Sequence, residues 1–579
     1  MKKRYNRIIA LVIAMMMALA LIAACGGQGS TTPDAPAPAP APAPDAPDAP
    51  APAPEGWTPD PNQVLRFGTT GLDGFFNSIM ASNVYDNYVC ALVFETLVTN
   101  DASGMYFGYI ADYTVSDDHL VYTFTLKDGV KFSDGTPMTS ADVEFTYKTI
   151  AHPDYTGQRG YAVMDMVGYE AYSSGSSDVF SGIQVIDEKT ISFTFEDGTA
   201  SPANIESFVY GILPKHYYEF ETWDDFLALN GNPLGSGWFT LEEYRDKEFV
   251  LLHKNINYWD APNAASIDGV LMSEIPEESL QGAFQTGQLD LAQPQTSVDN
   301  WDAYTAMAGV TPLSILGNGY TFMCFNTTKP TLNDHLVRQA LMYALDRPSF
   351  IEAVYGPHAS VGLAPISPVS WAFPQSGIND YAFNMAKAEE LMAEAGWVKG
   401  SDGILAKGGV KMEITWLVYT DVVWPGVLAS MAADTWGQLG VDLTIDLMDF
   451  VTVGALTMDL PVDEREFDMY TMGWSTSIFP DLFGGIFGLD DEALGDFGYN
   501  ASGWFDQDLY ELMAAARQEF DFAKAADMYK ELALGLNYNL PTAVVAYRNE
   551  MWVNSDRVNG LNISSYENWT YNFNKVTLS

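Results

Sequence analysis

Side chains that could carry covalent or metal chemistry are few in this sequence and stand far apart. It holds three cysteines, Cys25, Cys90 and Cys324, and six scattered histidines, so no Cys-His spacing typical of a metal site occurs. The motifs G-x-S-x-G, H-E-x-x-H, G-x-G-x-x-G and the P-loop do not occur in it. Seventy-five acidic residues could supply a catalytic carboxylate pair, but that abundance makes any chosen pair uninformative. We therefore expect no catalytic residues, metal or cofactor.

The charge balance argues against nucleic acid as a partner. Lys and Arg number 28 against 75 Asp and Glu, a formal net charge of −47, and no basic run follows the first seven residues. Such a chain would be repelled by phosphates. Apolar residues make up 47%, which indicates a folded protein, and the length of 579 residues predicts several domains.

The first 24 residues predict a signal peptide. Four basic residues stand among the first seven, and residues 8–24 are uncharged and apolar, too short and too early for a comfortable lone membrane span. Residues 22–26, IAACG, resemble a bacterial lipobox. On that interpretation Cys25 is lipidated and becomes the mature N-terminus. An ordinary secretory cleavage beside an incidental cysteine is the alternative.

Residues 25–62 predict a disordered tether. Pro-Ala repeats fill the stretch from Pro33 to Pro54, without a periodic apolar face, and should form a semi-rigid polyproline-like spacer. A binding motif for a proline-recognising domain is the other interpretation. Beyond the tether, Cys324 lies in the apolar stretch Tyr320 to Phe325, so we expect Cys90 and Cys324 to be buried free thiols rather than a disulfide.

Residues 112–150 predict a strand, two turns and a capped helix. From His119 to Leu126 apolar and polar residues alternate, as in a strand with one buried face. Asp-Gly turns at 128–129 and 134–135 flank a short return strand over Val130 to Phe132. Thr139 with a carboxylate three residues on, Asp142, is a capping box, so a helix should begin there. Its apolar stripe is Val143, Tyr147 and Ile150.

Later segments alternate between strand and helix patterns, which indicates α/β layering. Helical spacing marks residues 85–97, 335–345 after the cap Asp334, 386–396 with a terminal glycine, and two segments within 506–537. Strand patterns mark residues 64–68, 181–195, 320–325 and 542–552, and residues 441–447, where we expect Val441, Leu443, Ile445 and Leu447 to point inward.

The order strand, Lys-Asp-Gly, strand, Asp-Gly-Thr-Pro and capped helix resembles the signature of the family 5 solute-binding proteins, the extracytoplasmic receptors of peptide- and nickel-type ABC transporters. Other phrases that resemble the family follow in family order over nearly all of residues 63–579: ETLV at 95–98, ILPKH at 212–216, NPLGSGWF at 232–239, NINYW at 255–259, VRQA at 337–340 and ALDR at 344–347. For Arg338 and Arg347 we expect structural salt bridges.

This resemblance implies an α/β, two-lobed periplasmic-binding-protein fold with a hinge. The first lobe would comprise residues 63–318 and 542–579, with an extra inserted subdomain near 108–230. The second lobe would comprise residues 319–541. Because the chain would cross the hinge twice, the lobes could close on a ligand between them.

The resemblance also indicates where a ligand would lie. In peptide-binding members an Asp after a Gly-Trp-like pair takes the peptide's α-amino group, and here the matching position after Trp474 is Ser477. Dipeptide-binding members place a carboxylate-clamping Arg after a Trp-containing strand, whereas residues 414–423 contain no Arg but do contain Asp421. Both charged clamps of a dipeptide are therefore missing from these positions. Longer peptides held by main-chain hydrogen bonds, or non-peptide solutes, remain.

Eight residues are the candidate ligand contacts on this resemblance: Trp474, Ser475, Thr476, Ser477, Tyr419 and Asp421 on one wall, and Leu72 and Asp73 in the Gly-rich loop after the first strand on the other. Core packing is the alternative for the aromatic side chains, and a solvated loop acid is the alternative for Asp421.

The sequence thus predicts a monomeric, lipid-anchored receptor of an ABC importer, on the outer face of the cell membrane or in the periplasm. It would bind a peptide, on this interpretation an oligopeptide, and pass it to membrane permease subunits. An oligosaccharide or other organic solute is the alternative ligand, and an envelope glycosidase is the alternative from another class.

Overall fold

The computed structural model describes residues 59–458, 460, 464–480, 482, 486–487 and 500–579, all of them in one unit that spans Ala49–Ser579. The predicted signal peptide, the lipidation site Cys25 and residues 25–58 of the predicted tether lie outside the described residues. Within the described part of the chain, no helix combines the length and the apolar character needed to cross a bilayer.

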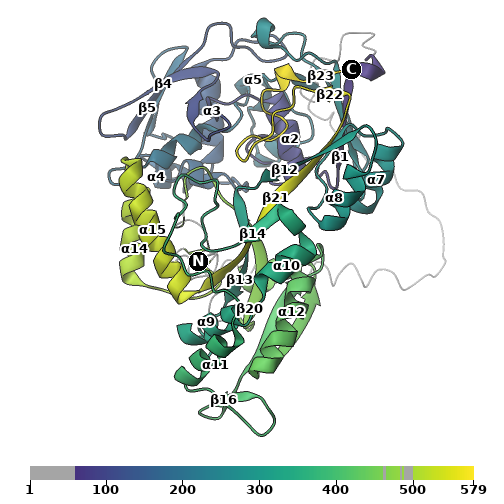
Figure 1. Cartoon of the computed structure of the whole chain (residues 1–579). Helices are drawn as coiled ribbons and strands as arrows, with labels where there is room; N and C mark the ends of the chain where they lie inside the picture. The colour runs from purple at the N-terminus through teal and green to yellow at the C-terminus, as the bar shows by residue number, and fades with distance from the viewer. Residues whose placement is uncertain (1–58, 459, 461–463, 481, 483–485, 488–499) are drawn as a thin grey trace, which may run out of the picture. The chain divides into compact units, whose positions relative to one another are not determined.

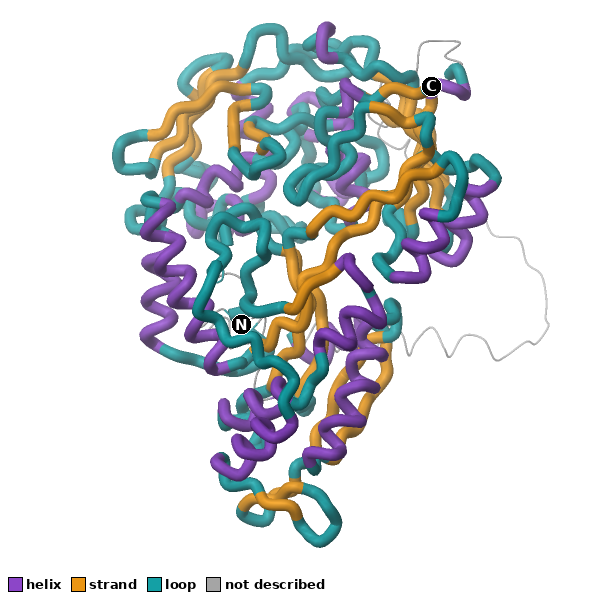
Figure 2. The backbone as a smooth tube through the Cα atoms, in the orientation of Figure 1, coloured by secondary structure: helices purple, strands orange, loops and turns teal. Residues whose placement is uncertain are grey.

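A 12-stranded mixed sheet runs through this unit (Figures 1 and 2). Its main path, in spatial order, consists of β19 (Asp442–Met448), β18 (Glu413–Tyr419), β20 (Met469–Ser475), β13 (Gly319–Phe325), β21 (Thr542–Ser555), β11 (Leu291–Ala292), β1 (Val64–Thr69), β10 (Gly269–Glu274), β9 (Phe249–Lys254) and β8 (Phe239–Arg245). Two further strands, β12 (Val310–Leu316) and β14 (Ala359–Val361), pair with β21 off this path.

Strand β21 joins two hydrophobic cores. Its first part pairs with β13 and β14, and its second part pairs with β12 and β11. Residues Ala543–Tyr547 belong to a core made otherwise of residues 320–540, while Trp552 belongs to the core that contains residues 65–291 and 558–578. The predicted boundary at residue 542 stays a prediction, but the packing changes inside β21, between Tyr547 and Met551.

A second sheet and several short ones complete the strands. The four-stranded sheet, in spatial order, is β4 (Ala111–Val115), β5 (Val121–Leu126), β7 (Thr190–Thr194) and β6 (Ile183–Val185). The short sheets are β2 (Val98–Asn100) with β3 (Tyr106–Gly108), β15 (Val398–Lys399) with β16 (Leu405–Lys407) and β17 (Val410–Lys411), and β22 (Val558–Asn559) with β23 (Thr577–Leu578).

The α-helices pack beside these sheets (Figure 1). They are α2 (Val84–Val93), α3 (Ser140–Ile150), α4 (Tyr169–Ser173), α5 (Lys215–Tyr218), α6 (Trp223–Leu227), α7 (Glu277–Gln285), α8 (Val298–Thr305), α9 (His335–Tyr343), α10 (Arg347–Val354), α11 (Met385–Glu394), α12 (Trp424–Leu439), α13 (Phe450–Thr457), α14 (Gln507–Arg517) and α15 (Phe522–Asn539).

Local chemistry explains where several of these elements begin. Helix α3 starts as the capping box predicts, since the Asp142 carboxylate accepts the Thr139 backbone N–H at 2.8 Å. The Asp334 side chain accepts the Leu336 N–H at the start of α9. Strand β5 buries Tyr122, Phe124 and Leu126, the face expected from its alternation. Cys90 and Cys324 are buried and free, as predicted.

Two strand predictions are wrong in detail. The segment from Val130 to Phe132 contributes only a single bridge, Lys131 with Pro137, because two tight turns leave no room for a ladder. Strand β19 does not bury its alternating face: Leu447 is 64% exposed, and Leu443 and Ile445 are only partly buried. It is the edge strand of the sheet on this side, so its alternation does not imply a covering layer.

The expected salt bridges of Arg338 and Arg347 are not formed among the described residues. Both side chains are buried, and both donate to backbone carbonyls instead. Arg338 donates to the carbonyls of Leu332, Asn539 and Leu540. Arg347 donates to Gly362 O at 2.5 Å and to Val544 O at 3.1 Å, and also to Asp380 O. Burial lowers the pKa of each to about 10. Through these hydrogen bonds the two arginines hold α9 and α10 against the start of β21.

Replacing Arg347 should test whether its hydrogen bonds to these carbonyls stabilise the fold. In Arg347→Met three carbonyls lose a charged donor, so we expect the free energy of unfolding to fall by about 3 kcal/mol. Urea unfolding would measure the change. Arg245→Met, which changes an exposed side chain of β8, is the matched control and should change stability by less than about 0.5 kcal/mol. An equal, small effect of both changes would contradict a structural role for Arg347.

A buried carboxylate stands between α2 and β2. Glu95 is 3% exposed, and it accepts hydrogen bonds from Tyr258 Oη at 2.7 Å and from Trp259 Nε1 at 2.8 Å. Burial outweighs these bonds and raises the pKa of Glu95 to about 7. The three residues come from two of the family-like phrases, residues 95–98 and 255–259, so those phrases meet in one buried contact.

The raised pKa of Glu95 predicts a pH dependence of stability. A carboxyl whose pKa is higher in the folded than in the unfolded protein stabilises the folded state most at low pH. This contribution to the free energy of unfolding falls by about 1.4 kcal/mol per pH unit and is lost as the pH rises toward about 7. Chemical unfolding of wild type and Glu95→Gln between pH 5 and 8 would measure it. The free energy of unfolding of the variant, relative to that of wild type, should increase as the pH rises. A difference independent of pH would contradict the assignment.

Candidate functional site

The carboxyl ends of three parallel strands form one edge of the sheet. Strand β18 pairs in parallel with β19, with Tyr419 opposite Met448, and with β20, with Leu417 opposite Tyr470. The loops that follow β18, β19 and β20 therefore emerge together. In open α/β sheets such an edge is the usual place for a ligand. Six of the eight residues predicted as ligand contacts lie here.

The loop after β20 is held in place by Asn318. Trp474, half-buried, lies opposite Tyr320 of β13. The Asn318 Nδ2 group donates to Thr476 O at 2.8 Å and to Ser477 O at 3.1 Å, and Thr476 Oγ1 lies 2.8 Å from Asn318 Oδ1. Ser475 and Ser477 are exposed, although the Ser477 hydroxyl donates to Phe479 O within its own loop. This edge thus presents an indole, hydroxyls and fixed backbone groups.

Tyr419 and Asp421 have local structural partners. Tyr419 is 7% exposed and contacts the rings of Trp424 and Phe450 at centroid distances of 5.9 and 5.4 Å. Burial raises the pKa of Tyr419 to about 12. One oxygen of Asp421 accepts the Phe450 N–H at 2.8 Å, in the first turn of α13. Asp421 therefore stabilises a helix start, and a role in binding a cation stays a prediction.

The predicted opposite wall needs a correction at Leu72. Its side chain is fully buried in the core, so it cannot line a cleft, and its backbone N–H donates to Glu274 Oε2 at 3.3 Å. Asp73 is exposed and accepts Asn83 Nδ2 at 3.2 Å. Glu274 ends β10, which runs parallel to β1, so this loop also lies at a carboxyl edge. Asp73 therefore stays a predicted ligand contact, whereas the buried side chain of Leu72 does not.

Polar residues in the middle of β21 were not among the predicted site residues. Arg548, Asn549 and Glu550 interrupt a strand that is otherwise buried from Thr542 to Tyr547 and from Met551 to Val553. Glu550 accepts Gln293 Nε2 at 3.0 Å, and Gln293 directly follows β11. The signal in the sequence was this break in an apolar run, which has no counterpart among the family-like phrases.

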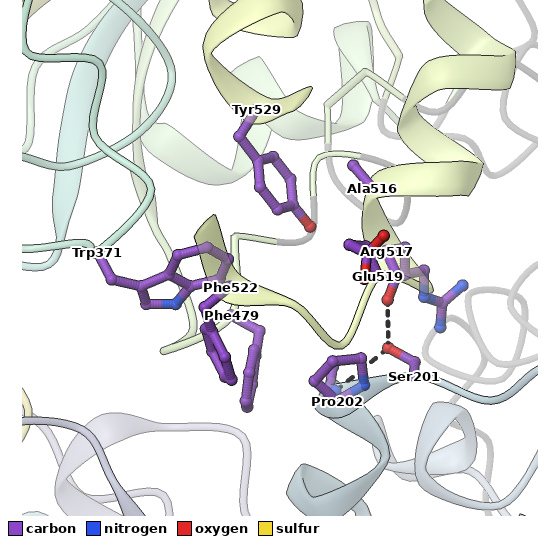
Figure 3. Close-up of a pocket in the computed structure, with 10 residues that line it drawn as sticks. Ser201, Pro202, Trp371, Phe479, Ala516, Arg517, Glu519, Phe522 and Tyr529 are labelled. Atoms are coloured by element: carbon purple, nitrogen blue, oxygen red, sulfur yellow. Dashed lines mark hydrogen bonds between the residues drawn. The ribbon is translucent and has the colours of Figure 1, made fainter. Parts of the chain in front are cut away.

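A pocket adjoins the loop after β20 (Figure 3). It has a volume of about 300 Å³ including its open mouth, and its enclosed part has room for about one water molecule. The residues that line it are Ser201, Pro202, Ala203, Trp371, Phe479, Ala516, Arg517, Glu519, Phe522 and Tyr529. None of the eight predicted residues is among them, and Phe479, two residues beyond Ser477, provides the connection.

The walls of this pocket come from segments distant in sequence. Figure 3 shows Ser201 Oγ donating to the Arg517 carbonyl, at 2.7 Å. The indole of Trp371 packs edge-on against the rings of Phe522 and Tyr529, with distances between ring centroids of 4.9 Å and 5.8 Å. Asp165 and Arg517 form an ion pair at 3.6 Å close by. In this conformation the contacts leave no space for a ligand of several residues. Among the described residues, no three His, Cys, Asp or Glu side chains gather as a metal site would require.

Comparison with known proteins identifies what this arrangement resembles. Residues 106–489 match the model of the bacterial extracellular solute-binding proteins, family 5 (middle part). The chain is 27% identical to the oligopeptide-binding protein AppA of Bacillus subtilis over 433 residues, which cover 73% of this chain and 76% of that protein.

Solved structures share the fold. The structure of Bacillus subtilis AppA in complex with a nonapeptide superposes with a TM-score of 0.73 at 23% identity, covering 89% of this chain and 99% of that one. NikZ from Campylobacter jejuni, in complex with Ni(L-His), superposes with a TM-score of 0.75 at 21% identity, covering 89% and 100%. The predicted α/β periplasmic-binding-protein fold is thereby confirmed.

Proposed function

Because the chain belongs to the bacterial extracellular solute-binding proteins of family 5, we propose that it is the substrate-binding receptor of an ABC importer. It captures a peptide, in our proposal an oligopeptide, between its two lobes and delivers it to permease subunits in the membrane. The observation that carries this proposal is the family match over residues 106–489, which includes the edge formed by Trp474 to Ser477.

The chemistry of the edge supports a peptide ligand. A peptide needs main-chain hydrogen-bond partners and apolar surface, and the edge offers the exposed hydroxyls of Ser475 and Ser477 beside the Trp474 ring. The relative AppA is named an oligopeptide-binding protein, which also favours a peptide as the ligand. Binding and release need no bond making, so we propose no catalytic role. An oligosaccharide would also stack on aromatic rings such as Trp474 and Trp371, and it is the second candidate ligand.

The protein is proposed to act outside the cytoplasm as a monomer held by lipid at Cys25. A basic and apolar leader followed by IAACG supports this placement. Two acyl chains would anchor the tethered body stably, whereas one chain would give only marginal binding.

Lipidation can be tested at Cys25. Cells that express Cys25→Ala should accumulate unlipidated protein, because the acceptor thiol is lost. Incorporation of radiolabelled palmitate, measured on the immunoprecipitated protein, should fall to background. Cys90→Ala is the matched control and should keep full incorporation. Label that persists in Cys25→Ala would contradict the lipobox.

Ligand binding can be tested on the body from Gln63 to Ser579. Mass spectrometry of small molecules released by denaturing the purified protein should reveal peptides, and calorimetry with random peptide libraries of three to nine residues should give a measurable affinity. Trp474→Ala should weaken that affinity by about tenfold, because it removes a half-buried aromatic contact. The variant should unfold at nearly the wild-type temperature.

Other outcomes of the binding experiment are equally informative. Sugars in place of peptides among the released molecules would favour the second candidate. Turnover of glycoside or peptide substrates would contradict a binding function altogether. Unchanged affinity in Trp474→Ala would mean that the ligand lies elsewhere.

A further inference from the structure

Arg548 lies where the chain crosses between the two cores. Its backbone in β21 pairs with Ala359 of β14, and its carbonyl accepts the Gly317 N–H at 3.3 Å. Gly317 directly follows β12, and Gly319 opens β13 opposite Ser475. Only the segment from Gly317 to Gly319, where the chain passes from β12 to β13, therefore separates Arg548 from the candidate edge at Ser475.

The Arg548 guanidinium is exposed and has no partner among the described residues. No described carboxylate lies within ion-pair distance of it, and no hydrogen bond from its side chain is formed in the described part of the chain. Other arginines of this sheet are engaged: Arg66 and Arg557 both bind Asp290, at 2.7 and 2.9 Å. An unengaged cation stands out in a chain with a net charge of −47.

The positive charge of Arg548 acts on two tyrosines that belong to different elements. Burial raises the pKa of Tyr355, which caps α10, and the charge of Arg548 opposes that rise. The same charge opposes the rise of the pKa of Tyr419, at the end of β18. Arg548 therefore lies within electrostatic reach of the candidate edge.

The nearby acids do not neutralise Arg548. Glu550, two residues along the same strand face, is held by Gln293, and Asp421, whose charge also reaches Tyr419, accepts the Phe450 N–H. The acids near it thus have their own donors, and the guanidinium keeps its hydrogen-bonding fork available for an anion.

We propose that Arg548 binds an anionic carboxylate of the ligand. This inference rests on the proposed function, and it supplies from β21 the countercharge that residues 414–423 lack. A guanidinium binds a carboxylate through two parallel N–H···O bonds. The carboxylate is the peptide's C-terminus or an Asp or Glu side chain.

Three matched peptide probes distinguish these sources. They are a pentapeptide library with free C-termini and no acidic residue, the same library amidated at the C-terminus, and the amidated library with one Glu in its interior. Calorimetry at low ionic strength would give the affinity of wild type, Arg548→Gln, Arg548→Lys and the exposed-site control Arg245→Gln for each library.

For a C-terminal carboxylate we expect wild type to prefer the free library by at least about tenfold, and Arg548→Gln to abolish the preference. Arg548→Lys should retain part of it, because a lysine keeps the charge but not the fork. For an acidic side chain, the interior Glu should supply the same preference and Arg548→Gln should remove it. Arg245→Gln should bind like wild type in both cases.

Two results would overturn the inference in separable ways. If wild type binds all three libraries equally, or if Arg548→Gln keeps the wild-type preference, the anion site is wrong while peptide capture stands. If wild type binds no peptide, the proposed function itself fails. Equal unfolding temperatures of wild type and Arg548→Gln would confirm that the folded protein is being compared.

Discussion

The architecture depends on one strand that is shared by two cores. Strand β21 begins in the core around β13 and ends in the core around β1. Its two ends are fixed by buried charges. At the start, Arg338 and Arg347 bind backbone carbonyls. At the far end, Asp290 accepts the Ser555 hydroxyl at 3.3 Å and the guanidinium groups of Arg66 and Arg557.

Asp290 illustrates why such an anchor is tolerated inside a protein. Burial alone would raise its pKa, but hydrogen bonds from Arg66 and Arg557 outweigh burial and hold the pKa of this carboxyl below its usual range. Both ends of β21 are thus satisfied by charged hydrogen bonds. Its centre differs from the buried segments on either side, because Arg548 is exposed and Asn549 and Glu550 are only partly buried. A strand fixed at both ends and solvated in the middle is a natural place for two lobes to pivot and for a ligand to bind.

Sequence patterns predicted the elements well where the cause is local. The Thr139–Asp142 cap, the glycine after α11 and the alternation of β5 depend on neighbours a few residues away. Patterns failed where a distant segment decides the outcome. The exposure of Leu447 depends on which strand lies at the edge of the sheet, and two of the three carbonyl partners of Arg338, Asn539 and Leu540, lie about 200 residues away in the chain. For the site, the predicted ligand-contact loops stay a prediction, and the burial of Leu72 and the isolation of Arg548 depend on tertiary packing that the sequence patterns do not show.

Net charge and local charge act over different distances in this protein. A chain with a formal net charge of −47 repels an approaching anion over long range, which should slow association. Salt limits that repulsion to about 8 Å at physiological ionic strength. At the proposed site, the unpaired guanidinium of Arg548 would be closer to the ligand than most of the acids, and Glu550 and Asp421 already accept hydrogen bonds. An acidic receptor can therefore hold a carboxylate through one well-placed cation, and the net charge then affects the rate of capture more than the strength of binding.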